Sequence, residues 1–296
     1  MRQLNQISTY LNFIVLFLFC GCTDSFLGDD EISGNNRIVR GKVQLENFND
    51  ASGVFVWLEG LQISTKTDQD GNFELFLPAS SAVVNESLLE LFCYVGNYVP
   101  YKESLVVRDG AFVYSENKIN SSGSFNEPFF MIKSFDIDVM VRPSRISNRK
   151  NAPLNIQVTL SSVHEKAKVF FPFNVDGFRT PLIFKNLDTG EITVRNTTLV
   201  GLGSIENVVL SKTEYIRSYV ANVASNEFIA GSYEIIPYML VPDQVVPQEL
   251  LTSIHPNVEK IGKNYLQLPF KRSGGKFDVY EGADILDINN VAIKYW

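Results

Sequence analysis

The chain has 296 residues, of which 45% are hydrophobic, and its formal net charge is −7 at pH 7. This length suffices for about two domains of roughly 150 residues each. The acidic excess argues against nucleic acid as a main partner, because phosphate binding needs a basic surface. The composition includes 22 Phe and 12 Tyr but only 3 Cys and 2 His, and aromatic richness favours strands over helices.

The N-terminus combines one early charge, Arg2, with a short apolar run at 13–19 and the sequence FCGC at 19–22. The run is too short to cross a bilayer, which takes about 20 residues, and the combination is typical of a secretory signal. It resembles a bacterial lipoprotein signal, in which cleavage precedes a cysteine that becomes lipidated. Cys22 fits best, because the small Gly21 precedes it. An ordinary secretory signal and an N-terminal membrane anchor are the alternatives.

This resemblance implies a signal peptide at 1–21, lipid on Cys22 and a polar, acidic, flexible tether at 22–36. Aspartate after the lipidated cysteine retains lipoproteins in the inner membrane of some bacteria, and Thr23 stands there instead. We therefore expect an exported protein that its lipid holds in the outer membrane or at the cell surface.

From residue 37 onward, apolar runs of strand length alternate with turn residues. The run at 53–60 places Val54, Val56 and Leu58 on one face and Phe55 and Trp57 on the other. A spacing of 8–12 residues between such runs indicates an all-β sandwich. The main runs before the middle of the chain are 37–45, 53–60, 63–67, 73–77, 87–95, 103–107 and 129–141, the last being one long strand or two with a bend.

The sequence predicts two tandem β-sandwich domains. The first covers 37–142, a basic, proline-containing linker covers 143–152, and a second, Ig-like sandwich with additional C-terminal strands covers 153–296. The best helical patterns are short, near 246–253, and the sequence leaves the exact fold of 242–296 undefined.

Four stretches of the first predicted sandwich share a family pattern: a glycine before a strand, then GV-V-L-G, then T-D-DG-F and a proline. The matching positions are Gly41, Gly53, Val54, Val56, Leu58, Gly60, Thr67, Asp68, Asp70, Gly71, Phe73 and Pro78. Residues 38–107 thus resemble a carboxypeptidase regulatory-like domain, a transthyretin-like β-sandwich common in exported bacterial proteins. The resemblance implies a fold and an accessory role. It implies no carboxypeptidase activity, because in such enzymes this module accompanies a separate catalytic domain.

The sequence Asp68-Gln69-Asp70-Gly71 has the composition of a calcium loop. With Gly71 at position 6 of such a loop, Lys66 takes position 1 and Leu77 takes position 12, where oxygen ligands are required. Asp-Gly between two strand patterns is a strong hairpin signal. We interpret the stretch as a hairpin turn.

Residues for catalysis or metal binding do not form a recognisable pattern. His164 and His255 are far apart, and in the HEKAK sequence Lys168 replaces the second histidine of a zinc motif. Asp136 and Asp138 alternate with apolar residues, as on the solvated face of a strand. We predict no catalytic residues, no metal and no cofactor.

Aromatic residues are the remaining candidates for ligand contact. Trp57, Tyr98 and Tyr101 could form an exposed platform that stacks on a sugar or docks a protein, and packing within the sandwich is the alternative. The sequence therefore favours a lipid-anchored envelope protein with a non-catalytic binding or structural role and a protein or glycan partner. The alternatives are a carbohydrate-binding accessory lipoprotein and a proteinase inhibitor of Ig-like fold.

The lipid anchor can be tested by metabolic labelling with palmitate. The wild type should incorporate the label and Cys22→Ala should lose it, because the substitution removes the acceptor thiol. Equal labelling of the two proteins would refute the anchor.

Overall fold

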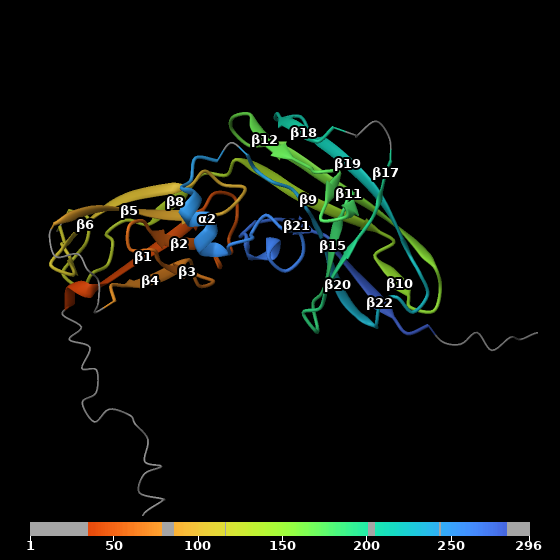
Figure 1. Cartoon of the computed structure of the whole chain (residues 1–296), viewed down its shortest axis with the longest axis horizontal. Coiled ribbons are helices and arrows are strands. Elements are labelled where there is room, and N and C mark those ends of the chain that lie inside the picture. The colour runs from red at the N-terminus through yellow and green to blue at the C-terminus, as the bar shows by residue number, and fades with distance from the viewer. Residues whose placement is uncertain (1–34, 79–85, 116, 201–204, 243, 283–296) are drawn as a thin grey trace, which may run out of the picture.

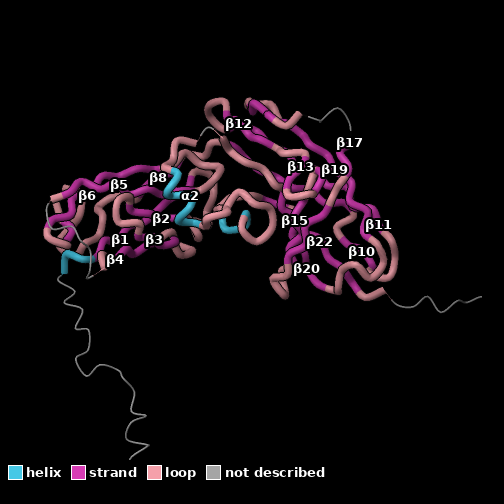
Figure 2. Tube along the Cα trace, in the orientation of Figure 1, coloured by secondary structure: helices cyan, strands magenta, loops and turns pink. Residues whose placement is uncertain are grey.

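A computed structural model describes residues 35–78, 86–115, 117–200, 205–242 and 244–282; the predicted lipidation site, Cys22, lies outside these ranges. The described chain is almost entirely β, which confirms the predicted fold class. Its strands form two groups that lie side by side along the long axis (Figures 1 and 2). We call residues 35–133 the N-terminal lobe, residues 134–242 with 273–282 the C-terminal lobe, and residues 244–272 the bridging segment.

The N-terminal lobe begins with a 3₁₀ turn, η1 (Asn35–Arg37), and contains two facing sheets. One sheet has the order β4-β1-β8, with β4 at Asn72–Phe76, β1 at Ile38–Leu45 and β8 at Phe129–Met131. The other has the order β3-β2-β5-β6-β7, with bounds Ile63–Lys66, Phe55–Leu58, Ser87–Tyr94, Tyr101–Arg108 and Ala111–Phe112. The inward faces of both sheets form one core.

Two sequence patterns produce this lobe. The alternation in β4 buries Phe73 and Leu75 and leaves Phe76 on the outer face. Strand β2 is buried at every position, as expected of a strand covered on both faces. Val56 and Leu58 point into the core between the sheets, and Trp57 points to the opposite side.

The C-terminal lobe also contains two facing sheets, each with five strands, and two small ribbons beside them. One sheet has the order β17-β19-β11-β9-β21 (Thr198–Val200, Tyr215–Val223, Ala152–Ser162, Phe135–Arg142 and Ser273–Gly274). The other has the order β10-β22-β20-β15-β16 (Arg145–Ser147, Lys276–Tyr280, Gly231–Pro237, Leu182–Asn186 and Ile192–Arg195). The ribbons are β12-β18 (Ala167–Phe170 and Asn207–Leu210) and β13-β14 (Asn174–Val175 and Phe178–Arg179). A separate core lies between the two larger sheets.

The bridging segment carries the short helix α2 (Gln248–Ile254) and the 3₁₀ turn η2 (Tyr265–Gln267). Leu250 of α2 is fully buried against the outer face of β2 and β5, among aromatic side chains that include Trp57. Burial of one leucine side chain stabilises by about 1.5–3 kcal/mol. Tyr265 is buried against the outer face of β15 and β20. The segment therefore covers one sheet of each lobe.

The strand pairing corrects the boundaries expected from the sequence. The sequence predicts that strand β9 belongs to the first sandwich, yet it pairs along its whole length with β11. The sequence predicts a linker at 143–152, yet this stretch contains β10, where Ile146 is buried. The run at 129–141 is two strands that belong to different lobes. Alternation identifies a strand but does not specify its partner, so these assignments required the tertiary structure.

The Asp68–Gly71 stretch is a turn, but not one that closes a hairpin. Strand β3 before it pairs with β2, and β4 after it pairs with β1, so the turn connects the two facing sheets. Asp68 Oδ1 accepts hydrogen bonds from the backbone amides of Asp70 (3.0 Å) and Asn72 (2.8 Å). These bonds, that of Asn72 first, lower the pKa of the Asp68 carboxyl. The Asp68 carboxylate is thus accounted for by turn chemistry.

Gly71 provides a test of this turn. Its φ is +82°, and a Cβ there would lie 2.1 Å from the carbonyl oxygen of Val43. Gly71→Ala should cost about 3 kcal/mol, since positive φ and overpacking add. Gly190 has φ +74° and no heavy atom within 4 Å of such a Cβ, so Gly190→Ala should cost only about 1 kcal/mol. Urea unfolding of both variants measures the difference; equal losses would contradict the close approach at Gly71.

Candidate functional site

The junction between the lobes is built around Asn97, which is fully buried. Its Nδ2 donates to the carbonyl oxygens of Lys271 (2.8 Å) and Phe135 (3.1 Å), and its Oδ1 accepts from the Lys271 amide (2.9 Å). The Asn97 carbonyl also accepts from the Ser134 amide at 3.0 Å. One side chain of the N-terminal lobe therefore bonds to the start of β9 and to the bridging segment.

Packing beside Asn97 requires a glycine. A Cβ on Gly96 would lie 2.5 Å from the ring of Phe270 in the bridging segment, and the Gly96 amide donates to the Pro269 carbonyl at 2.7 Å. Gln244 Nε2 donates to the carbonyl of Tyr98 at 3.2 Å. The loop before β6 is thus fixed by the bridging segment from both sides.

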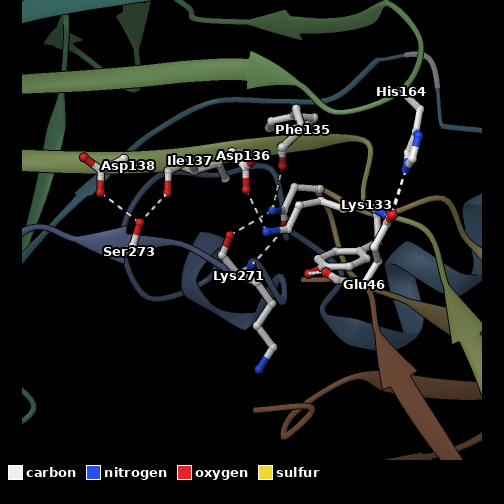
Figure 3. Close-up of polar contacts among 11 residues, drawn as sticks. Glu46, Lys133, Phe135, Asp136, Ile137, Asp138, His164, Lys271 and Ser273 are labelled. Atoms are coloured by element: carbon white, nitrogen blue, oxygen red, sulfur yellow. Dashed lines mark hydrogen bonds and ion pairs between the residues drawn. The ribbon is translucent and has the colours of Figure 1, made fainter. Parts of the chain in front are cut away.

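Lys133 marks the point where the chain passes from one lobe to the other. Its side chain is 6% exposed, and its Nζ lies 2.7 Å from Asp136 Oδ1 (Figure 3). The same ammonium lies 5.7 Å from the ring centre of Phe48 and 5.9 Å from that of Tyr98. Cation–π contact and an ion pair together compensate a nearly buried charge.

A groove of about 510 Å³ opens between the lobes next to Lys133. Its apolar lining includes Val99, Phe130 and Ile132, which are 51%, 53% and 46% exposed. Several exposed large apolar side chains in one groove are typical of a contact surface. The facing side is the loop before β12 and the start of that strand, with His164, Glu165, Lys166 and Lys168.

Glu46 and His164 connect the two sides of this groove (Figure 3). Nε2 of His164 lies 2.8 Å from Oε2 of Glu46, which also accepts from the Lys133 amide at 2.9 Å. An ionised carboxylate only accepts, so the imidazole donates. The bonds from His164 and then Lys133 lower the pKa of the Glu46 carboxyl. Their stabilisation is present above the ordinary carboxyl pKa and is lost as the pH falls through the lowered value.

The predicted aromatic platform is wrong, because its members do not share an exposed surface. Trp57 is 1% exposed and lies beneath α2. Tyr98 is fully buried and donates to the Glu46 carbonyl at 3.0 Å. Tyr101 is half-buried, with its ring stacked 4.6 Å from that of Phe129. These residues stabilise the fold instead of offering a stacking surface.

The described ranges contain no group of three or more His, Cys, Asp or Glu side chains that could hold a metal ion. Asp136 and Asp138 lie on the exposed face of β9, where Asp138 accepts from the Ser273 hydroxyl at 2.8 Å. Cys93 is a buried free thiol whose pKa burial raises. Within the same residues, no helix has the length and apolar character to span a bilayer.

The residues of the junction were not identified from the sequence. Asn97 stands in a stretch whose tyrosines are its most prominent feature, and Lys271 is far from it along the chain. The sequence does offer one signal, because Asn97 is a polar residue inside a strongly apolar run. Such a residue is expected to be buried and to form hydrogen bonds there.

Asn97 can be tested by truncation. Asn97→Ala leaves the Lys271 amide and two buried carbonyls without their partner and should lower the free energy of unfolding by about 2–4 kcal/mol. Hydrogen exchange of the Lys271 amide should accelerate. Asn257→Ala is the control. Asn257 is exposed on the same bridging segment, so this substitution should leave the free energy of unfolding nearly unchanged. Equal effects of the two substitutions would contradict the role of Asn97.

Comparison with known proteins adds little to this geometry. No family model matches the sequence, and no curated protein matches it. Two solved structures are similar at 11% identity: a variant of BcpA, the major pilin subunit of Bacillus cereus, over 84% of this chain and 70% of that chain, and BcpA itself, over 83% and 69%. Their TM-scores of 0.27 and 0.26 are too low to carry an argument about function.

Proposed function

We propose that this chain is a non-catalytic protein of the cell envelope, anchored by lipid on Cys22, that binds a partner protein in the groove between its lobes. The exposed apolar lining of that groove is the observation that carries the proposal. Elsewhere, the bridging segment covers the outer faces of two sheets, so the apolar side chains on those faces are buried. In the groove, comparable side chains stay exposed.

The chemistry of the groove favours a polypeptide segment over a glycan. Its apolar side is aliphatic and aromatic. Of the aromatic residues expected to stack on sugars, Trp57 and Tyr98 are buried and Tyr101 is half-buried. Its facing side carries Lys166 and Lys168 beside the single acid Glu165. A segment with apolar side chains and acidic neighbours would meet both sides, because opposite charges steer and orient a partner.

The fixed junction is the second support. A partner that contacts both sides of the groove gains most when the two sides are preorganised, since less conformational entropy is lost on binding. The Asn97 hydrogen bonds and the Glu46–His164 contact hold the two sides in one arrangement. This supports a presenting or adaptor role at the cell surface.

Photo-crosslinking in intact cells tests the proposal. With p-benzoyl-phenylalanine in place of Val99, illumination should produce a discrete species of higher mass, and Lys166→Glu in the same protein should reduce its yield several-fold. Val200 is equally exposed, at 52%, on strand β17 of the C-terminal lobe, and the same probe there is the control. Equal crosslinking from both positions, or none from Val99, would reject the groove as the binding site.

A further inference from the structure

The outer face of sheet β17-β19-β11-β9-β21 is exposed in the described part of the chain and carries apolar side chains. Met140, Ile216 and Val200 are 39%, 49% and 52% exposed on three of its strands. The bridging segment covers the outer faces of two other sheets but not this one. Several exposed apolar side chains on one sheet face are typical of a contact surface. The order of the side chains indicates what this face contacts.

The strand register arranges the outward side chains of this face in rows across β9, β11, β19 and β17. Side chains two apart along a strand share a face, so successive rows are about 7 Å apart. The positions that β11 contributes are polar and uncharged. In chain direction along β9, the other strands contribute to three successive rows Asp138 and Ile216, then Met140 and Val200, then Arg142 and Val220.

A two-fold axis along the middle row makes this face complementary to itself. Rotation about that axis reverses the strand direction and keeps each strand over its own counterpart, as in an isologous dimer. Met140 then lies against Met140 of the other copy. Arg142 lies against Asp138, and Ile216 lies against Val220. Apolar side chains thus meet apolar ones, and opposite charges meet twice, once on each side of the axis.

Both members of this charge pair are on the surface. Arg142 is exposed and has no ion-pair partner among the described residues. Asp138 is exposed as well and accepts from the Ser273 hydroxyl at 2.8 Å, and a carboxylate can accept several hydrogen bonds. Asp136, the next acid along β9, is already paired with Lys133. Asp138 is therefore the acid of β9 that is available to a second copy.

The shape of the face agrees with the same rotation. A groove of about 310 Å³ lies between the middle row and the basic row, lined by Met140, Arg142 and Val200 among others. The rotation brings the exposed side chain of Ile216 from the other copy to the β19 side of this groove. An apolar side chain thus meets a partly apolar hollow, as the shape complementarity of specific interfaces requires.

The size of the face is that of a weak dimer interface. Strand β9 has eight residues, which span about 27 Å at roughly 3.4 Å per residue, and four strands roughly 4.8 Å apart span about 19 Å. The face therefore covers about 500 Å² on each copy. Two copies would bury about 1,000 Å² in total, which is the range of weak and reversible complexes.

The outer face of β4-β1-β8 lacks this symmetry. Phe76 and Phe130 are 52% and 53% exposed near its two ends, and Arg40 and Lys42 point outward between them on β1. Arg40 pairs with Glu74. The same rotation about the middle of that face would bring Arg40 against Lys42, and like charges in contact are unfavourable. Self-association is therefore favoured at the C-terminal lobe.

We infer that two copies of this chain form an isologous dimer through the outer face of β17-β19-β11-β9-β21, with Arg142 of each copy paired to Asp138 of the other and Met140 on the axis. These residues do not line the groove between the lobes, so the dimer is independent of the proposed function. Val200 lies on the dimer face. The cellular control at Val200 is therefore read on crosslinked products other than a dimer of this chain.

Sedimentation velocity of the purified full chain tests this inference, with no partner present and in reducing buffer to prevent disulfides. The wild type should change from monomer to dimer as its concentration rises. Arg142→Glu and Asp138→Arg should each weaken the dimer about ten-fold or more, because each brings two pairs of like charges into contact. An equal mixture of these two variants should associate like the wild type, since opposite charges then meet in both pairs.

Lys276→Glu is the control, because Lys276 is exposed on the other sheet of the same lobe, and it should leave the dimer unchanged. Met140→Lys is an independent variant. It places two ammonium groups against each other on the axis and should abolish the dimer without lowering the melting temperature.

A chain that stays monomeric at every concentration would overturn the inference, as would a dimer that Arg142→Glu and Met140→Lys leave intact. A mixture of the two charge variants that stays monomeric, when each has the melting temperature of the wild type, would overturn the register. If Asp138→Arg lowers the melting temperature through the loss of the Ser273 bond, Met140→Lys against Lys276→Glu decides the outcome.

Discussion

Asn97 is the group on which the arrangement of the two lobes depends. A buried primary amide has two donors and an acceptor to satisfy, and here they are satisfied by the backbone of β9 and of the bridging segment. Carbonyls and an amide at this position would be unsatisfied without that side chain, and each unsatisfied buried group costs about 1–3 kcal/mol. The junction is therefore specified by directional bonds, whereas the lobe cores are specified by burial.

The bridging segment covers an apolar sheet face in each of the two lobes. Strands β2 and β15 each place large apolar side chains on both of their faces, and a single pair of sheets can cover only one face of each. By running across both lobes, residues 244–272 cover the second face of each and remove it from water. The same segment of the chain thus buries the apolar outer faces and supplies hydrogen-bond partners to Asn97.

This construction determines which surfaces remain for binding. Trp57 and Tyr98, two of the aromatic residues that the sequence offers for ligand contact, are structural. Trp57 lies beneath α2, and the Tyr98 hydroxyl donates to the Glu46 carbonyl. The groove between the lobes keeps apolar side chains exposed beside the Glu46–His164 contact, and the outer face of β4-β1-β8 keeps two phenylalanines exposed around a basic middle. Phe130 belongs to both surfaces.

The sequence by itself determined the all-β class, most strand positions, the two-sided character of β2 and the turn at Asp68, because alternation and turn chemistry are local properties. It did not determine that β9 belongs with β11, that the Asp68 turn joins facing sheets, or that residues 244–272 return to the N-terminal lobe. Those features depend on which strand pairs with which and on contacts between residues far apart in the chain, such as Asn97 and Lys271. A local pattern specifies that a side chain must be buried; only the tertiary structure decided what buries it.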